Sequence, residues 1–101
     1  MDGVKHNEGK LPIYTVLKEQ FPDAFLKVVE RSLLGHEKYE KGNDWSNFRR
    51  LPNAYNEFSN ALGRHLLEEG EDSQLDHHIA VAWNALARLQ LFIENENKNK
   101  T

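Results

Sequence analysis

The 101 residues of the chain are enough for one domain with one modest hydrophobic core, which self-association would help to stabilise. The 13 basic and 16 acidic residues give a formal net charge of −3, and the basic side chains are scattered, which argues against duplex DNA as a partner. The absence of cysteine excludes disulfide bonds and thiolate chemistry, and no apolar stretch is long enough to cross a membrane. We therefore expect a soluble, cytoplasmic protein.

The first half of the chain is predicted to contain an arm and two helices. Residues 1–10 have the composition of an extended arm. Pro12 is typical of a first helical position and predicts a short helix to about Phe21. A second helix begins at about Asp23 and ends before Gly42. The predicted core face of this helix has members at steps of three and four residues: Phe25, Val28, Val29, Ser32, Leu33, His36 and Tyr39.

The second half is predicted to form two longer helices after a loop rich in turn formers. Pro52 and Asn53 open a third helix, which ends at Gly70. The core stripe of this helix is Tyr55, Phe58, Leu62 and Leu66. Asp72 or Ser73 then caps a fourth helix. The apolar seam of the fourth helix, spaced for packing nearly antiparallel to a neighbour, is Leu75, Ile79, Ala82, Leu86, Leu89 and Ile93.

These elements predict an all-α fold. We find no strand-like alternation and no internal repeat, so the second, third and fourth helices should form the core of a small bundle. We expect oligomerisation, as a dimer or tetramer, to complete that bundle. Residues 1–95 are then a single domain, and residues 96–101 are a polar tail that frays beyond the last helix.

Polar stripes beside the core stripes of the third and fourth helices predict a shallow pocket between them. Arg64 can grip a phosphate with its planar fork of donors, and Asn84 can bind a base or ribose edge. Alternatively, Arg64 and Glu68 form an exposed helical pair, and Asn84 is a buried amide that the backbone satisfies.

Histidines surround the same junction. His77 and His78 are adjacent, so they point about 100° apart on a helix, and at most one of them belongs to a site. His65 could pair with either across the hairpin. A histidine near a helix end is, however, more often a cap, a dipole partner or a core residue.

Two acidic pairs have the spacing that helical hydrolases use to hold magnesium: Glu37 with Glu40, and Glu69 with Asp72. A chain this rich in carboxylates contains a few such pairs by chance, and both lie at helix ends. Because Gly70 separates the second pair, nothing in the sequence fixes its members on one helical face. The sequence leaves open whether these four carboxylates converge.

Aromatic and basic groups near the glycines could contact a nucleotide. Tyr39 and Trp45 flank a Gly/Asn turn and could stack on a purine, while Lys10 could reach a phosphate. Alternatively, Trp45 simply plugs the open end of the helical bundle.

Four segments, taken together in order, carry a family resemblance: "KHNEGKLP", "LLGHEKYEKGNDW", "ALGRHLLEEGED" and "HHIAVAWNAL". They resemble the small, mostly phage-encoded family of dATP/dGTP diphosphohydrolase N-terminal domains, relatives of the all-α nucleotide pyrophosphohydrolases, from about residue 5 to residue 92. The resemblance implies an oligomeric four-helix protein with a purine-nucleotide pocket, in which Lys10, Lys38 and Arg64 contact phosphate. Ala80 departs from the family pattern, which has a histidine there.

We therefore expect a phage-type protein that binds a nucleotide and has no catalytic residue, resident metal or cofactor. Its expected ligand-binding residues are Lys10, Lys38, Tyr39, Trp45, Arg64, His65 and Asn84. By analogy with small phage nucleotide sponges, it would sequester a signal such as a cyclic purine dinucleotide in the cytoplasm of an infected bacterial host and so counter antiviral defence. The alternative is a dATP/dGTP pyrophosphohydrolase that uses Mg²⁺ or Mn²⁺. A purely structural interaction module would leave the basic groups at Lys10 and Arg64 unexplained.

Overall fold

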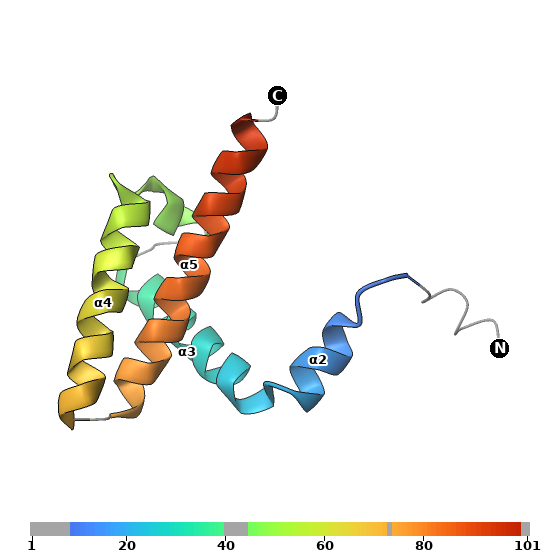
Figure 1. Ribbon diagram of the computed structural model, residues 1–101, viewed down its shortest axis with the longest axis horizontal. Helices are drawn as coiled ribbons and strands as arrows, with labels where there is room; N and C mark the ends of the chain where they lie inside the picture. Colours follow the sequence, from blue (N-terminus) through green and yellow to red (C-terminus); the bar gives the residue numbers. More distant parts are fainter. Residues whose placement is uncertain (1–8, 40–44, 73, 100–101) are drawn as a thin grey trace.

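The computed structural model describes residues 9–39, 45–72 and 74–99, together with the side chains in these ranges except those of residues 38–39 and 69–72. Every regular element in the described ranges is helical, which confirms the all-α prediction (Figure 1). In chain order the elements are α2 (Ile13–Glu19), α3 (Pro22–Tyr39), the short 3-10 helix η1 (Asn47–Arg50), α4 (Ala54–Asp72) and α5 (Leu75–Asn99).

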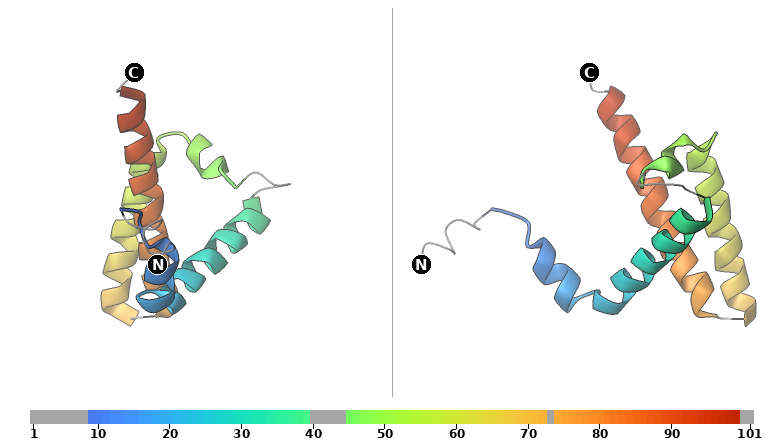
Figure 2. Two further views of the ribbon diagram at one scale, coloured as in Figure 1. Left: turned by 90° about the vertical axis from the view of Figure 1, so that its right-hand side faces the viewer. Right: turned by 180° about the vertical axis from the view of Figure 1, so that it is seen from behind.

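The helices α4 and α5 form an antiparallel hairpin against which the other elements are placed. The helix α3 packs on α5, and η1 packs on α4, whereas α2 projects away from the hairpin (Figures 1 and 2). The second, third and fourth predicted helices, now α3, α4 and α5, therefore form the body of the fold. None of the described helices is long and apolar enough to span a membrane.

The start of α4 follows from the chemistry of Asn53. Its φ of 58° lies in the left-handed region, which asparagine tolerates better than most residues. Its carbonyl accepts a hydrogen bond from the Glu57 amide at 3.0 Å, and its side-chain oxygen accepts one from Asn56 at 3.0 Å. The prediction that a helix opens after Pro52 and Asn53 is confirmed.

Two predicted helix ends are wrong. The helix α4 continues through Gly70 to Asp72, so the backbone of residues 69 and 72 belongs to one helical run. The helix α5 continues to Asn99, four residues into the segment that we predicted to fray. In both places the helical hydrogen bonds of a long packed helix outweigh a single glycine or a polar composition, each of which costs about 1 kcal/mol or less per residue.

The contact between α4 and α5 uses small residues of α5 rather than its predicted seam. Ala80 is fully buried, Asn84 is 4% exposed and Ala87 is 5% exposed, and their spacing places them on one helical face. Side chains this small let the two helix backbones approach closely. The predicted seam is wrong, because its large members remain about half exposed: Leu75, Leu86, Leu89 and Ile93. The three- and four-residue periodicity identified an apolar face of α5 but not which face the chain itself covers.

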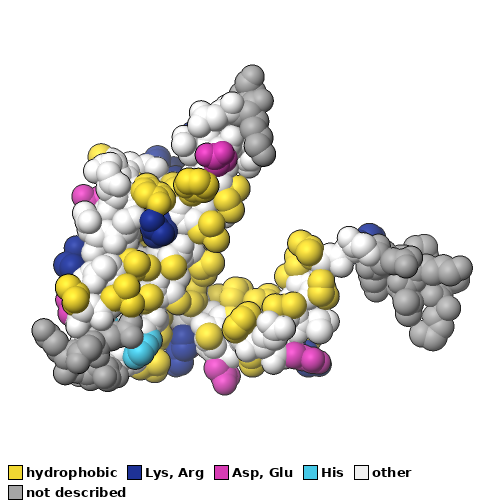
Figure 3. Space-filling view, in the orientation of Figure 1, with side chains coloured by type: hydrophobic (Ala, Val, Ile, Leu, Met, Phe, Trp, Pro, Cys, Tyr) yellow, Lys and Arg dark blue, Asp and Glu magenta, His cyan; other side chains and the backbone are white. Residues whose placement is uncertain are grey.

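Much apolar surface therefore remains exposed. Hydrophobic side chains follow α5 and continue across α3 onto the projecting α2 (Figure 3). The helix α2 has no buried residue. The radius of gyration of the Cα atoms is 16.7 Å, whereas a compact domain of 100 residues has about 13 Å. The described chain is open rather than closed around one core.

Candidate functional site

An open cleft of about 1230 Å³ lies between α3, η1, α4 and α5. Glu57 is the only acidic side chain among the described residues that line it. The arginines of the lining are Arg31, Arg49, Arg50 and Arg64, and its aromatic residues, apart from histidine, are Trp45, Phe48, Phe58 and Trp83. The described lining is thus strongly cationic and rich in flat side chains.

The four arginines differ in how they are engaged. Arg49 binds Glu94 of α5 through two nitrogens at 2.7 to 2.9 Å, and this hydrogen bonding lowers the pKa of the Glu94 carboxyl below its usual value. Arg50 also interacts within the protein. Arg31 on α3 and Arg64 on α4 have no ion-pair or hydrogen-bond partner among the described residues. Within the described part of the structure, neither charge is engaged in an ion pair.

The alternative in which Arg64 pairs with Glu68 is not what the fold shows. Glu68 instead lies against His65 and His77. Since Arg64 is exposed and lines the cleft, the phosphate-binding hypothesis for it is compatible with its position.

The aromatic wall of the cleft is a cluster of three rings. Phe48 of η1, Phe58 of α4 and Trp83 of α5 lie with ring centroids 5.4 to 6.1 Å apart in tilted or edge-to-face geometry, an arrangement favourable for aromatic pairs. The indole N–H of Trp83 donates to Ser32 Oγ at 2.8 Å, which fixes this wall to α3. The cluster fixes the position of η1 against the hairpin.

Trp45 contributes a different kind of surface. Its ring stacks on His36 with centroids 3.9 Å apart and planes 7° from parallel. It is nevertheless 54% exposed, so it does not plug the described bundle. A flat, supported and exposed indole is suited to stacking on a base.

Asn84 lines the cleft, but part of its hydrogen-bonding capacity is used by the backbone of its own helix. Its side-chain nitrogen donates to the Ala80 carbonyl at 2.7 Å, as in the alternative of a buried amide that the backbone satisfies. Its remaining hydrogen-bonding capacity is what it could offer a ligand.

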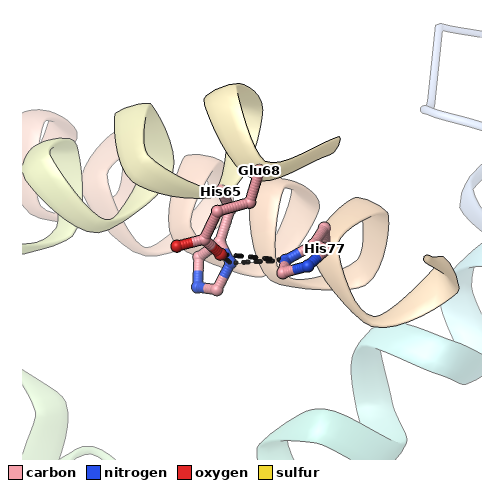
Figure 4. Close-up of side chains that lie close together, drawn as sticks. All are labelled: His65, Glu68 and His77. Carbon is pink, nitrogen blue, oxygen red and sulfur yellow. Dashed lines mark hydrogen bonds and ion pairs between the residues drawn. The ribbon is translucent and has the colours of Figure 1, made fainter. Parts of the chain in front are cut away.

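One cluster in the described chain has the composition of a metal site. His65 and Glu68 from α4 converge with His77 from the first turn of α5 (Figure 4). The two histidine Nδ1 atoms are 3.2 Å apart, and a Glu68 oxygen lies 3.4 Å from His65 Nδ1 and 3.1 Å from His77 Nδ1. Of the two histidines that could pair with His65, the fold selects His77.

Comparison with known protein families matches residues 1–101 to the family described as dATP/dGTP diphosphohydrolase, N-terminal. The chain belongs to this family. The match extends over the whole chain and confirms the resemblance inferred from its motifs. No curated protein and no solved structure matches the chain.

The other predicted site residues of this family member are not all near the cleft. Lys10 is exposed on the arm before α2 and is not among the residues that line the cleft. Glu37 is likewise exposed and outside the lining. The predicted side chains that lie outside the described part of the structure are those of Lys38, Tyr39, Glu40, Glu69 and Asp72.

The described lining of the cleft is poor in the carboxylates that commonly hold magnesium in proteins. Mg²⁺ is held by carboxylate and other oxygens, and Glu57 is the only carboxylate among the described lining residues. The cluster of His65, Glu68 and His77 offers two nitrogens and one carboxylate, which suits a softer ion.

Sequence reasoning missed two residues that shape the cleft. Arg31 lies three residues after Val28, on the edge of the predicted core face, and this spacing is the signal that could have placed it at the pocket. Trp83 adjoins Asn84, but no local pattern indicates that it meets Ser32, because that contact depends on how α3 crosses α5.

Proposed function

We propose that this family member binds a cyclic purine dinucleotide in the cleft and sequesters it without hydrolysis. The observation that carries the proposal is the placement of Arg31 and Arg64, both without partners among the described residues, on two helices that line one cleft beside the exposed Trp45. Guanidinium groups bind phosphate oxygens through paired hydrogen bonds.

The charge of the cleft favours a ligand with two separate phosphates. A cyclic dinucleotide has two phosphodiesters with one negative charge each, which two guanidinium groups can neutralise. A nucleoside triphosphate concentrates more charge, and enzymes that cleave it neutralise that charge with metal ions. The single carboxylate in the described lining, Glu57, supports retention of a nucleotide rather than magnesium-assisted cleavage.

The size and aromatic character of the cleft also support a dinucleotide. The volume of about 1230 Å³ exceeds the roughly 300 to 1000 Å³ of typical small-ligand pockets. The ring of Trp45, supported by His36, offers a stacking surface for a base. The family description names dATP and dGTP, and this supports purines as the bases. Retention of such a signal in an infected bacterial cell would oppose a defence response that depends on it.

One incubation experiment distinguishes binding of a nucleotide from its hydrolysis. The protein is mixed with a cyclic purine dinucleotide, dATP or dGTP in the presence of Mg²⁺ or Mn²⁺, and the nucleotide is analysed by chromatography after heat release. We expect recovery of the cyclic dinucleotide, intact and in a fixed ratio to protein. Multiple turnovers that yield a monophosphate and pyrophosphate from dATP or dGTP would overturn the proposal and establish the hydrolase.

The assignment of the two arginines is tested by calorimetry with the cyclic dinucleotide. Arg31→Ala and Arg64→Ala should each weaken binding by about tenfold or more, because each removes a charge-assisted contact worth about 1.5 to 3 kcal/mol. Lys27→Ala is the matched control, since Lys27 is a cation on the same helix as Arg31 but lies outside the cleft lining. Equal losses in all three variants would indicate a general charge effect rather than a site.

A further inference from the structure

We propose that His65, Glu68 and His77 form a site for a divalent transition metal with tetrahedral coordination, of which zinc is the representative ion. The proposal rests on the geometry of these three side chains and does not depend on the nucleotide proposal. The ion would join α4 to the first turn of α5 near the closed end of the hairpin (Figure 4).

The spacing of the three ligand atoms fits such an ion. They lie 3.1, 3.2 and 3.4 Å from one another. Donor atoms bonded to a tetrahedral zinc at about 2.0 to 2.1 Å are separated by about 3.3 to 3.4 Å. One ion can therefore contact all three atoms with little movement of the helices.

The ligand types select the class of metal. Two imidazole nitrogens and one carboxylate oxygen form a set that zinc binds readily, whereas Mg²⁺ and Ca²⁺ prefer oxygen donors. The set also leaves the fourth tetrahedral position for a water molecule. The same chemistry fits Co²⁺, which makes that ion a spectroscopic probe of the site.

Local structure holds the donors together. Glu68 follows His65 by three residues on α4, so both side chains lie on the same helical face. His77 reaches them from the start of α5, where its amide bonds to the Gln74 carbonyl. Without a metal, one of the two Nδ1 atoms at 3.2 Å can donate a hydrogen bond to the other, whereas a metal ion would take a lone pair from each nitrogen.

The cluster is accessible to ions from solution. The side chains of His65 and His77 are 24% and 19% exposed, and that of Glu68 is 44% exposed. The ion would close a short loop of chain between residues 65 and 77. Metal affinity of this kind appears directly as added folding stability, and it falls at acidic pH because the histidines must be deprotonated.

The test uses tag-free, chelator-treated protein with zinc or cobalt alone. We expect one ion per chain by calorimetry, intense visible bands of tetrahedral Co²⁺, and a melting temperature raised on the order of 10 °C when free zinc is about 100 times its Kd. Excess Mg²⁺ should produce none of these changes. The absence of stoichiometric zinc binding would overturn the proposal.

Variants locate the ion. His65→Gln, Glu68→Gln and His77→Gln should each lower zinc affinity by at least about tenfold, with loss of the cobalt bands. His78→Gln is the matched control, since His78 is the adjacent, exposed histidine outside the cluster. Circular dichroism of the metal-free variants shows whether each has folded. Zinc binding that survives His77→Gln, or that is lost equally in His78→Gln, would contradict the assigned site.

Discussion

The indole N–H of Trp83 on α5 donates to Ser32 Oγ on α3 at 2.8 Å, although the two residues are 51 positions apart in sequence. Trp83 is also the residue through which the ring cluster of Phe48 and Phe58 meets α5. The bond therefore links the position of α3 to the aromatic wall of the cleft. Because both partners are partly buried, its loss leaves a donor or an acceptor without a partner.

A double-mutant cycle measures this bond. Ser32→Ala should lower the free energy of unfolding by about 1 to 3 kcal/mol, because it leaves the Trp83 N–H unsatisfied. Ser32→Ala in a Trp83→Phe background should cost less, with a coupling of about 0.5 to 1.5 kcal/mol. Urea denaturation of the four proteins gives these values, and additive effects would show that the bond contributes nothing.

The face of α5 that packs on α4 is the second testable feature. Ala80 is fully buried there, so Ala80→Leu should destabilise the protein by about 1 to 3 kcal/mol through overpacking. Ala85→Leu on the exposed side of the same helix should change stability by no more than about 0.5 kcal/mol. Thermal and urea unfolding compare the two variants. A larger cost at Ala85 than at Ala80 would mean that the helix packs through its other face.

The error in the predicted seam of α5 shows what helical periodicity can and cannot determine. The helix has an apolar stripe of leucines and a narrow stripe of small residues, Ala80, Asn84 and Ala87. A sequence pattern of apolar spacing identifies the stripe of large side chains as the packing face, whereas close packing of two helices is easiest along the stripe of small ones. Only the tertiary arrangement decides which of the two stripes is buried by the other helices of the same chain.

The features of the candidate site likewise fall into those that local sequence predicts and those that depend on contacts between helices. The position of Arg64 on the wall of the cleft was predicted from the polar stripe of one helix, which is a local property. The meeting of His65 with His77 depends on the length of the turn between α4 and α5, and the role of Arg31 depends on the crossing of α3. Such relations between elements have no signal in a single local motif.

The pair formed by Arg49 and Glu94 predicts a pH dependence. The pKa of Glu94 is lowered in the fold from its ordinary value of 4.5, chiefly by the hydrogen bond from Arg49. The pair therefore contributes stability above the pKa of the unfolded chain and loses it as the pH falls through the lowered value. In Glu94→Gln this part of the acid sensitivity should be absent.

The measurement is urea unfolding between about pH 6 and about pH 3. The stability advantage of the wild-type protein over Glu94→Gln should shrink steadily toward the acidic end. Glu96→Gln, which alters an exposed carboxylate on the same helix, should keep the wild-type slope. A constant difference between wild type and Glu94→Gln across this range would contradict the lowered pKa.

The projecting helix α2 requires a covering surface. It has seven residues and no buried side chain, and helices shorter than about 12 to 15 residues are marginal in water on their own. Leu11, just before α2, and Ile13 and Tyr14, within it, are 65 to 81% exposed. The exposed leucines of α5 offer an apolar surface of the same kind on every chain. We therefore expect a second copy of the chain to cover α2.

Sedimentation analysis tests this expectation at micromolar concentration. The wild-type protein should sediment as a dimer or larger assembly, and Ile13→Glu should shift it toward the monomer, because a buried charge without a partner opposes apolar association. Gln20→Glu is the matched control, since it adds the same charge to the exposed polar residue that follows α2 as its C-cap. The Ile13→Glu variant should also lose helical signal in circular dichroism, as α2 frays without its cover. A wild-type monomer that retains full helicity would show that α2 is stable alone and would refute the role given to self-association.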